Sequence, residues 1–429
     1  MFLTYFNPAN LAIIACPGGE VFADEVISHL KKGYRRNIEK SSAELAQRYG
    51  MSPDDIIRQI NIINEAIYPH AKTYTGKHKF SAPQFKVPTR FTVFANGEVK
   101  AEIQESIRGK DVYIFQDVEN HYPVNFLGGD DKKILSVNDH LMTVLVTIDA
   151  ARYAGANRII LVIPIYPYSR QHKSKGREGL TASRIGKIFE SLGVDHIITL
   201  DIHSRDIANA FTMMKLENLH ASYQIIRTLS EIDGILSDDL VVVSPDTGAV
   251  DRNKFFAASL KKPLALLYKE RDYSRISADA DDSNISEIRL LGKVRDKTVF
   301  MADDMLGTGG TLLKGMRTLK EHGARRVICS ISLPLFSGDA VKYFDEAYNE
   351  GLFYRIIGTN AIYQEEVLHR EWYINVNITG LFAQTITRLH QNLSLSNLLD
   401  NREIINRLVT ETQGADMQQE LPFHGEHRD

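Results

Sequence analysis

The chain has 429 residues, of which 43% are hydrophobic and 24% are charged, with a formal net charge of −3. This length suggests two to three domains, the charge gives no basic excess for binding nucleic acid, and no apolar run approaches the length of a membrane span. Two cysteines are too few for a disulfide scaffold, and the N-terminus lacks the pattern of a secretion signal. We therefore expect a cytoplasmic protein with no nucleic-acid partner and no membrane partner.

The first part of the chain predicts one strand and several helices. A short buried strand is expected over residues 11–16, and apolar residues follow at helical spacing over 21–32. The character changes between about 35 and 88, where two amphipathic helices are expected over 41–49 and 53–67. The second of these begins with proline and two acidic residues, which favour a helix start. We interpret residues 35–88 as an N-terminal helical insertion at the surface.

Strands and helices alternate along the rest of the chain. Strands are expected over residues 90–102, 111–116, 158–164, 196–200, 240–243, 264–268, 298–302, 326–331, 354–357 and 374–378, and helices over 138–154, 181–192 and 381–389. Such alternation predicts right-handed parallel βαβ units, hence an α/β fold of two doubly wound domains with mostly parallel sheets. We expect these domains to span residues 1–218 and 219–382, followed by a C-terminal helix and polar tail over 383–429.

One stretch combines a strand, an acidic pair, a glycine-rich turn and a helix. Residues 299–311 read Val-Phe-Met-Ala-Asp-Asp-Met-Leu-Gly-Thr-Gly-Gly-Thr. Glycines let backbone N–H groups close around a phosphate, and a helix N-terminus adds a favourable dipole. Two carboxylates at a strand end can accept hydrogen bonds from neighbouring sugar hydroxyls. The stretch therefore predicts a receptor for ribose 5-phosphate, made by Asp303, Asp304, Gly307, Thr308, Gly309, Gly310 and Thr311. It is not a Walker loop, because the first lysine after it is Lys314.

Further polar clusters follow other predicted strands, where ligands bind in open α/β sheets. The clusters are Phe94-Ala-Asn-Gly-Glu98, Tyr168-Ser-Arg-Gln-His-Lys173, Asp201-Ile-His203, Ser244-Pro-Asp-Thr-Gly248 and Lys269-Glu-Arg271. Each has an ordinary explanation by itself, since a strand-end Asp often caps the next helix and Lys-Glu-Arg is common on surfaces. Their joint occurrence in a fixed order around the ribose-phosphate stretch favours a shared function.

The acidic pair and glycine-rich turn resemble the phosphoribosyl-diphosphate motif of the type I phosphoribosyltransferase fold. The order of all the clusters resembles that of the ribose-phosphate pyrophosphokinases, or phosphoribosyl-diphosphate synthetases. This resemblance covers nearly all of residues 90–399. It implies transfer of the β,γ-diphosphate of ATP to O1 of ribose 5-phosphate, with AMP as the second product.

The resemblance also implies a role for each cluster. ATP would be held by Phe94, Asn96, Glu98, Arg170 and Gln171. Mg²⁺ would be held by Asp201, His203 and Asp246, and Asp246 would also contribute to the ribose 5-phosphate site. The catalytic residues would be Lys269, Arg271 and His203. The adenine side would be completed by a neighbouring subunit, so a homo-oligomer built from dimers is expected; the sequence leaves open whether it is a dimer or a hexamer.

Several residues depart from the family pattern, and two other functions stay open. Gly307 replaces a usual acid in the phosphate loop, and His172 replaces a usual acid after Gln171. One alternative is a phosphoribosyltransferase, which would have no use for Lys269 and Arg271. The other is a catalytically silent regulatory subunit, which loss of these cations would have favoured. Both cations are present.

Overall fold

The computed structural model describes residues 10–67, 84–126, 132–174, 176–232, 235, 239–271 and 285–419. Its contacts form two compact units. The first unit comprises Met1–Leu219, Ala361–Tyr363 and Ile378–Leu398, and the second comprises His220–Asn360, Gln364–Asn377 and Leu399–Asp429. The two units are therefore not two consecutive stretches of the chain, because two later segments belong to the first unit.

The first unit contains a parallel sheet with the strand order β1-β4-β5-β6-β7. Its strands are β1 (Leu11–Ala15), β4 (Asp111–Phe115), β5 (Arg158–Val162), β6 (His196–Leu200) and β7 (Lys215–Leu219). The last strand was not expected, because its sequence Lys-Leu-Glu-Asn-Leu is short and mostly polar. The parallel pairing confirms the α/β class.

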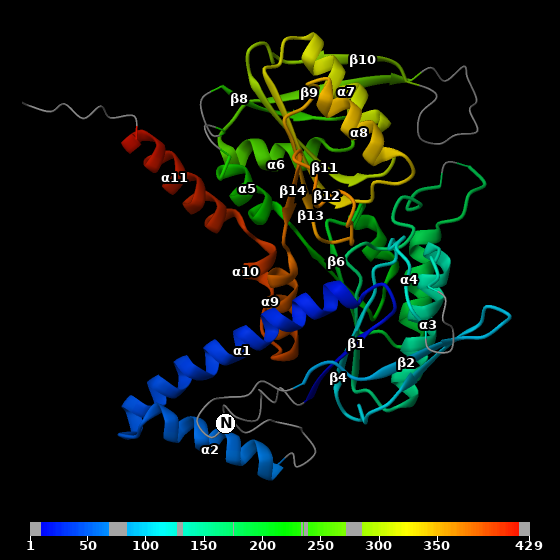
Figure 1. The fold of residues 1–429 in the computed structure, drawn as a ribbon, viewed down its shortest axis with the longest axis vertical. Helices are drawn as coiled ribbons and strands as arrows, with labels where there is room; N and C mark the ends of the chain where they lie inside the picture. The colour runs from blue at the N-terminus through cyan, green and yellow to red at the C-terminus, as the bar shows by residue number, and fades with distance from the viewer. Residues whose placement is uncertain are drawn as a thin grey trace, which may run out of the picture. The chain divides into compact units, whose positions relative to one another are not determined.

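Helices cover both faces of this sheet (Figure 1). On one face lie α3 (Val137–Tyr153) and α4 (Thr181–Ser191), and on the other lie α1 (Glu20–Tyr49) and α9 (Thr379–His390). The ring of Phe22 in α1 lies 6.4 Å from that of Phe115 and 5.0 Å from that of Phe382 in α9. A segment from the C-terminal part of the chain thus completes the core of the first unit.

The helices expected over 21–32 and 41–49 form one uninterrupted helix, α1, of 30 residues. The change of character near residue 35 does not end it, because buried positions continue at helical spacing through Tyr34 and Ala46. A single glycine inside it, Gly33, costs only about 1 kcal/mol relative to alanine. The next helix, α2 (Pro53–Ile67), has the expected bounds.

The end of the expected insertion belongs to the sheet. The N–H of Ile13 in β1 donates to the carbonyl of Phe85 at 2.8 Å, and the N–H of Val87 donates back to Ile13 at 2.8 Å. Phe85 is fully buried, and its ring lies 5.3 Å from that of Tyr34. Residues 85–87 are therefore part of the sheet edge and not of a surface excursion.

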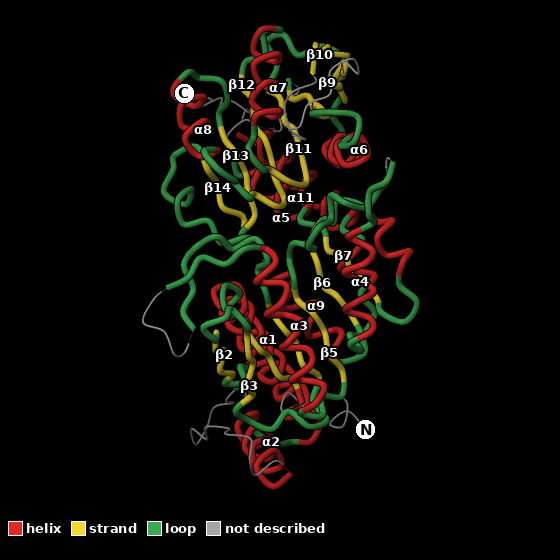
Figure 2. Tube along the Cα trace, turned by 90° about the vertical axis from the view of Figure 1, so that its right-hand side faces the viewer, coloured by secondary structure: helices red, strands yellow, loops and turns green. Residues whose placement is uncertain are grey.

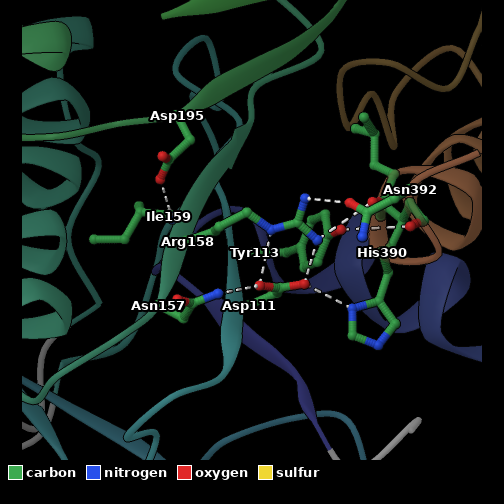
Figure 3. Close-up of polar contacts among 10 residues, drawn as sticks. Asp111, Tyr113, Asn157, Arg158, Ile159, Asp195, His390 and Asn392 are labelled. Atoms are coloured by element: carbon green, nitrogen blue, oxygen red, sulfur yellow. Dashed lines mark hydrogen bonds and ion pairs between the residues drawn. The ribbon is translucent and has the colours of Figure 1, made fainter. Parts of the chain in front are cut away.

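Helix α9 is anchored to the first sheet by a buried ionic group, the Asp111 cluster, which consists of Asp111, Arg158 and His390 (Figure 3). The Asp111 carboxylate accepts hydrogen bonds from Arg158 and, at 2.9 Å, from Nδ1 of His390. Arg158 also donates to Asn392 at 3.1 Å and to the carbonyl of Leu389 at 3.3 Å. The cluster joins the starts of β4 and β5 to the end of α9.

The second unit contains a seven-stranded sheet with the order β10-β9-β8-β11-β12-β13-β14. Its strands are β8 (Leu240–Ser244), β9 (Leu264–Arg271), β10 (Ile285–Leu291), β11 (Thr298–Leu306), β12 (Arg326–Pro334), β13 (Arg355–Thr359) and β14 (Tyr373–Val376). Among the described strands of this sheet, only β9 and β10 pair antiparallel. The mostly parallel second sheet confirms the expected fold.

Helices cover the second sheet on both faces as well (Figure 2). One face carries α7 (Gly310–Glu321) and α8 (Ala340–Asn349), whose apolar residues share a core with Met301 and Cys329. The other carries α5 (Ser222–Ser230), α6 (Val250–Leu260) and α11 (Arg402–Gln419). There the ring of Phe256 in α6 lies 5.3 Å from that of Phe300 in β11. Among the described residues, no helix is both long and apolar enough to cross a membrane.

Candidate active site

The acidic pair lies within β11 of the second unit, because this strand continues to Leu306, four residues beyond the expected end at 302. Asp303 is half-buried, and its Oδ1 accepts a hydrogen bond from the N–H of Asp304 at 2.9 Å. Burial raises the pKa of Asp303 well above its usual value, and the negative charges of Asp304 and Asp246 raise it further. Three carboxylates thus concentrate negative charge at the carboxyl ends of β8 and β11, which suits a cation or sugar hydroxyl donors.

Asp246 also has the structural role of a capping residue. Its Oδ1 accepts a hydrogen bond from the N–H of Ala249 at 2.9 Å, just before α6 begins, and its carbonyl accepts one from Ser244 Oγ at 2.7 Å. The hydroxyl and the carboxylate therefore fix the turn after β8. This turn holds the Asp246 carboxylate near Asp303.

The glycine-rich turn has a backbone shape that a side chain would disturb. Gly309 has a φ of 78°, and a Cβ added there would lie 2.4 Å from Cε2 of Phe344. The carbonyl of Gly307 accepts a hydrogen bond from the N–H of Ser337 at 3.1 Å, which ties the turn to the segment after β12. Helix α7 starts at Gly310, and its first N–H groups have no partner within the helix. The turn can therefore bind an anion.

Asn253 is a positioning residue that the sequence did not reveal. The pairing of β11 with β8 ends at Phe300. Beyond it, the buried side chain of Asn253 in α6 donates to the carbonyl of Ala302 at 2.8 Å and accepts from its N–H at 3.0 Å. These two hydrogen bonds fix the backbone next to Asp303. An Asn inside a helix gives no sign of such a distant partner, so no sequence signal could have identified it.

Lys269 and Arg271 lie in the last three residues of β9, opposite Ile288 and Ile285 of β10. The strand β10 was not expected, and it makes this part of the sheet a hairpin. Residues 272–284, which hold the expected catalytic loop, lie outside the described residues.

In the first unit, Phe94, Asn96 and Glu98 form the turn of a β-hairpin. The single strand expected over 90–102 is in fact two antiparallel strands, β2 (Thr89–Val93) and β3 (Val99–Ile103). The N–H of Phe94 donates to the carbonyl of Glu98 at 2.8 Å, and Asn96 Oδ1 accepts from the N–H of Glu98 at 3.2 Å. The Asn-Gly pair at the tip is a hairpin signal. Phe94 is 48% exposed, so its ring is available to a ligand.

Arg170 and Gln171 lie in the turn after β5. The N–H of Gln171 donates to the carbonyl of Tyr168 at 2.8 Å, and its carbonyl accepts from the N–H of Ala182 at 3.3 Å. Tyr168 has a φ of 57°, a conformation that is rare for residues other than glycine. Arg170 is exposed and lies close enough to Glu119 to oppose the rise in pKa that burial gives that carboxyl.

Asp201 and His203 follow β6 in a turn that is hydrogen-bonded to the neighbouring strand β7. Asp201 is buried with a φ of 40°, and its N–H donates to the carbonyl of Leu219 at 2.8 Å. His203 is exposed, and its ring centre lies 5.1 Å from that of His172. Burial lowers the pKa of His172, and the charge of His203 lowers it further.

The three expected Mg²⁺ ligands are divided between the units, since Asp201 and His203 belong to the first and Asp246 to the second. Within the part of the chain that the structure describes, no group of three or more His, Cys, Asp or Glu side chains is arranged to hold a metal ion. The donor types still fit Mg²⁺, which binds few protein ligands and keeps water and substrate phosphates in its shell. The ligand set stays a prediction.

Comparisons with known proteins agree with this arrangement. Residues 83–193 match the family model for the N-terminal domain of ribose phosphate pyrophosphokinase, and residues 214–348 match that for the phosphoribosyl transferase domain. The first match holds the hairpin and the Arg170 turn. The second holds the Asp246 turn, the acidic pair and the glycine-rich turn.

Proteins named ribose-phosphate pyrophosphokinase in several organisms are similar to this chain. The chain is 34% identical over 308 residues to a ribose-phosphate pyrophosphokinase of Nostoc sp., with 71% of this chain and 84% of that protein covered. It is also 34% identical to ribose-phosphate pyrophosphokinase 1 of Listeria monocytogenes, over 72% of this chain and 88% of that protein. The corresponding values for ribose-phosphate pyrophosphokinase 2 of Schizosaccharomyces pombe are 34%, 71% and 86%.

A solved structure has the same fold over nearly its whole length. Phosphoribosylpyrophosphate synthetase from Mycobacterium smegmatis aligns with a TM-score of 0.65 and 25% identity, over 89% of this chain and 99% of that one. The family models, the relatives and this structure agree on one assignment. The chain belongs to the ribose-phosphate pyrophosphokinase family.

Proposed function

We propose that the chain is an active ribose-phosphate diphosphokinase of the cytoplasm, which supplies 5-phosphoribosyl 1-diphosphate for nucleotide biosynthesis. The observation that carries this proposal is the glycine-rich turn at the start of α7, preceded by Asp303 and Asp304 in β11. It provides a receptor for a phosphate next to a receptor for a diol, which are the two groups that one ribose 5-phosphate presents. The matching N-terminal domain favours ATP as the other substrate.

The ribose 5-phosphate side follows from the second unit. Backbone N–H groups of residues 307–311 would bind the 5-phosphate, and the carboxylates of Asp303 and Asp304 would accept hydrogen bonds from the ribose hydroxyls. Because burial and then the neighbouring charges raise the pKa of Asp303, a bound cation or hydroxyl donors would stabilise the carboxylate there. The site therefore gains favourable contacts from the ligand that it is proposed to take.

The ATP side follows from the first unit. The exposed ring of Phe94 and the polar side chains of Asn96 and Glu98 would border the adenine, and Arg170 and Gln171 would hold the phosphates. We propose that the hairpin serves the site of a neighbouring subunit, so the active form is a homo-oligomer. A planar guanidinium suits phosphate oxygens because its N–H groups donate in pairs.

Mg²⁺ bound to ATP would neutralise charge on the phosphates during transfer. Asp201, His203 and Asp246 would hold it. Lys269 and Arg271 would bring two fixed positive charges to the diphosphate as it moves from ATP to O1 of the sugar. Phosphoryl transfer of this kind needs positioning and electrostatic stabilisation more than covalent help from the protein.

The test is an assay of the purified full-length protein with ATP, Mg²⁺ and ribose 5-phosphate. AMP and 5-phosphoribosyl 1-diphosphate should form in equal amounts, and neither should form when ribose 5-phosphate is omitted. A double variant, Asp303→Asn with Asp304→Asn, should abolish both products while leaving ATP binding in place. Failure of the wild-type protein to form AMP from ATP would support the silent subunit. If the protein instead forms a nucleoside monophosphate and free diphosphate when it is given 5-phosphoribosyl 1-diphosphate and a nucleobase, the phosphoribosyltransferase is supported.

A further inference from the structure

Two histidines from different turns contact each other edge to face in the first unit. His172 follows the Arg170 turn after β5, and His203 follows β6. Their ring centres are 5.1 Å apart, with an angle of 69° between the ring planes. They stand 31 positions apart in the sequence, so two separate strand ends bring them together.

The hydrogen bonding of His172 leaves one particular nitrogen for a ligand. Its Nδ1 lies 3.2 Å from the carbonyl oxygen of Ser169. A carbonyl oxygen only accepts, so Nδ1 carries the proton and Nε2 has the lone pair. Metal-binding histidines commonly donate their other ring N–H to a backbone carbonyl in this way, which fixes the tautomer and the ring orientation. Ser169 itself is buried, so the acceptor is held in place.

The separation of the rings suits two imidazoles on one ion. A metal–nitrogen bond of about 2.0–2.1 Å places the ring centre roughly 3.2 Å from the metal. Two such rings at tetrahedral or neighbouring octahedral positions have centres roughly 4.5–5.3 Å apart. The observed 5.1 Å lies inside this range.

We propose that His172 and His203 together bind a divalent transition metal, of the class of Co²⁺, Mn²⁺ or Zn²⁺, through one nitrogen each. This inference rests on the proposed function in one respect, because His203 is there a ligand of the nucleotide's metal ion. His172 is thereby a further ligand at the same position. Imidazole favours these ions over Mg²⁺, which prefers oxygen. The pair shifts the metal preference of this chain away from Mg²⁺.

The test is a titration of the tag-free, full-length protein with Co²⁺ alone, followed by calorimetry and by the visible absorption of the bound ion. His172→Ala should weaken Co²⁺ binding by at least about tenfold, the lower bound for disturbing a metal–histidine arrangement. His172→Asp should weaken Co²⁺ and strengthen Mg²⁺, because it replaces nitrogen with oxygen. Since this variant keeps a polar ligand in the turn, it also guards against a loss of binding caused by misfolding.

His322→Ala is the matched control, because His322 is exposed and its Nδ1 also contacts a backbone carbonyl, that of Thr318 at 2.7 Å. It lies in the second unit and should leave Co²⁺ binding unchanged. His203→Ala should weaken binding as much as His172→Ala, and the double variant should be no weaker than either single one, because both ligate one ion.

Wild-type Co²⁺ affinity in His172→Ala, or losses that simply add in the double variant, would overturn the proposal and leave the pair as an edge-to-face packing contact. The titration needs neither ATP nor turnover, so its result is separate from that of the proposed function. If Co²⁺ binds as expected and no AMP forms in the assay, the proposed reaction is wrong and the proposed metal site is supported. If AMP forms and Co²⁺ binding does not depend on His172, only the proposed metal site is wrong.

Discussion

Within the glycine-rich turn, Gly309 is the residue that can least be replaced by one with a side chain. Its positive φ costs a side-chain-bearing residue about 1–2 kcal/mol, and a Cβ would meet Phe344 besides. We expect Gly309→Ala to raise the KM for ribose 5-phosphate roughly tenfold or more, since 1.4 kcal/mol is a factor of ten. Steady-state kinetics measure this.

Gly33→Ala provides the control for that prediction, because Gly33 lies in α1 with open space where its Cβ would be. It should leave the KM unchanged and raise the melting temperature slightly. A normal KM in Gly309→Ala would mean that the turn does not hold the 5-phosphate.

Lys269 and Arg271 are expected to act mainly in the transition state. Loss of one preorganised electrostatic contact typically slows turnover by about 10²–10³. Lys269→Ala and Arg271→Ala should each do so, while the KM for ATP changes far less. Kinetics beside a thermal melt test this, with Lys254→Ala on α6 as the exposed-cation control. Near-normal turnover in either variant would favour the silent-subunit function.

At the scale of whole elements, local sequence predicted the strands of both sheets well only where these strands are apolar. The run before Asp303 and the apolar strand ending at Phe115 were correctly predicted, because buried parallel strands are continuous apolar segments. Strand β7 was missed because its five residues are mostly polar, and strand β10 was missed because its polar and apolar residues are mixed; each pairs with the strand that precedes it in the chain.

The residues of the candidate site were likewise predictable only in part. Motif residues such as Asp303 and Arg170 lie near the carboxyl ends of strands, so topology alone places them at that edge of a sheet. The hairpin at Phe94 could have been read from Asn-Gly. The bonds of Asn253 to Ala302 and the approach of His172 to His203 could not, because they depend on the packing of one element against another.

The Asp111 cluster makes the attachment of α9 dependent on pH. Burial opposes the charge on Asp111, but hydrogen bonds from Arg158 and His390 prevail and hold its pKa below the usual value. A lowered folded-state pKa gives stability that is present above the unfolded value, about 3.9, and is lost as pH falls below it. Asp111→Asn should cost about 3–5 kcal/mol at pH 7, because Arg158 loses its partner.

Thermal melts between pH 3 and 8 check this prediction. The difference in melting temperature between wild type and Asp111→Asn should be largest near neutrality and should shrink below about pH 4. Asp251→Asn is the control, since that carboxylate is exposed in an ion pair with Lys254 and should behave like wild type. A difference that does not change with pH would show that the carboxylate's charge is not what anchors α9.

Most of the segment between Tyr34 in α1 and Phe85 at the sheet edge should be removable, provided that the deletion leaves both of these residues in place. Deletion of all of 35–88 would also remove Phe85 and Val87, which are buried at the sheet edge. The rings of Tyr34 and Phe85 are 5.3 Å apart, so the chain leaves and returns at nearly one place. Replacing residues 37–82 with a short Gly-Ser link should therefore keep the fold and the diphosphokinase reaction.

Circular dichroism and the AMP assay test this deletion, with full 35–88 deletion as the comparison that should fold poorly. If the 37–82 deletion variant folds but has no activity, the deleted segment contributes to the active site or to the assembly of the oligomer.

At the scale of the whole molecule, we expect an oligomer whose subunits complete one another's sites. Phe94→Ala and Lys269→Ala should each be inactive alone. Mixed and reassembled, they should regain up to roughly a quarter of wild-type activity, since mixed dimers of twofold symmetry contain one intact site. Light scattering gives the mass of the same samples. An active monomer, or a mixture as inactive as its components, would exclude shared sites.

The return of α9 to the first unit has a consequence for how the protein is made. As the chain leaves a ribosome, residues 1–219 emerge first, and the sheet face bearing Tyr113 and Phe115 waits for a helix encoded after residue 378. Domains that are continuous in sequence can fold in turn during synthesis, but this unit cannot finish until most of the other has been translated. Its exposed apolar face would call for chaperone protection in the meantime, and a premature stop anywhere between the two segments would leave neither catalytic half with a complete core.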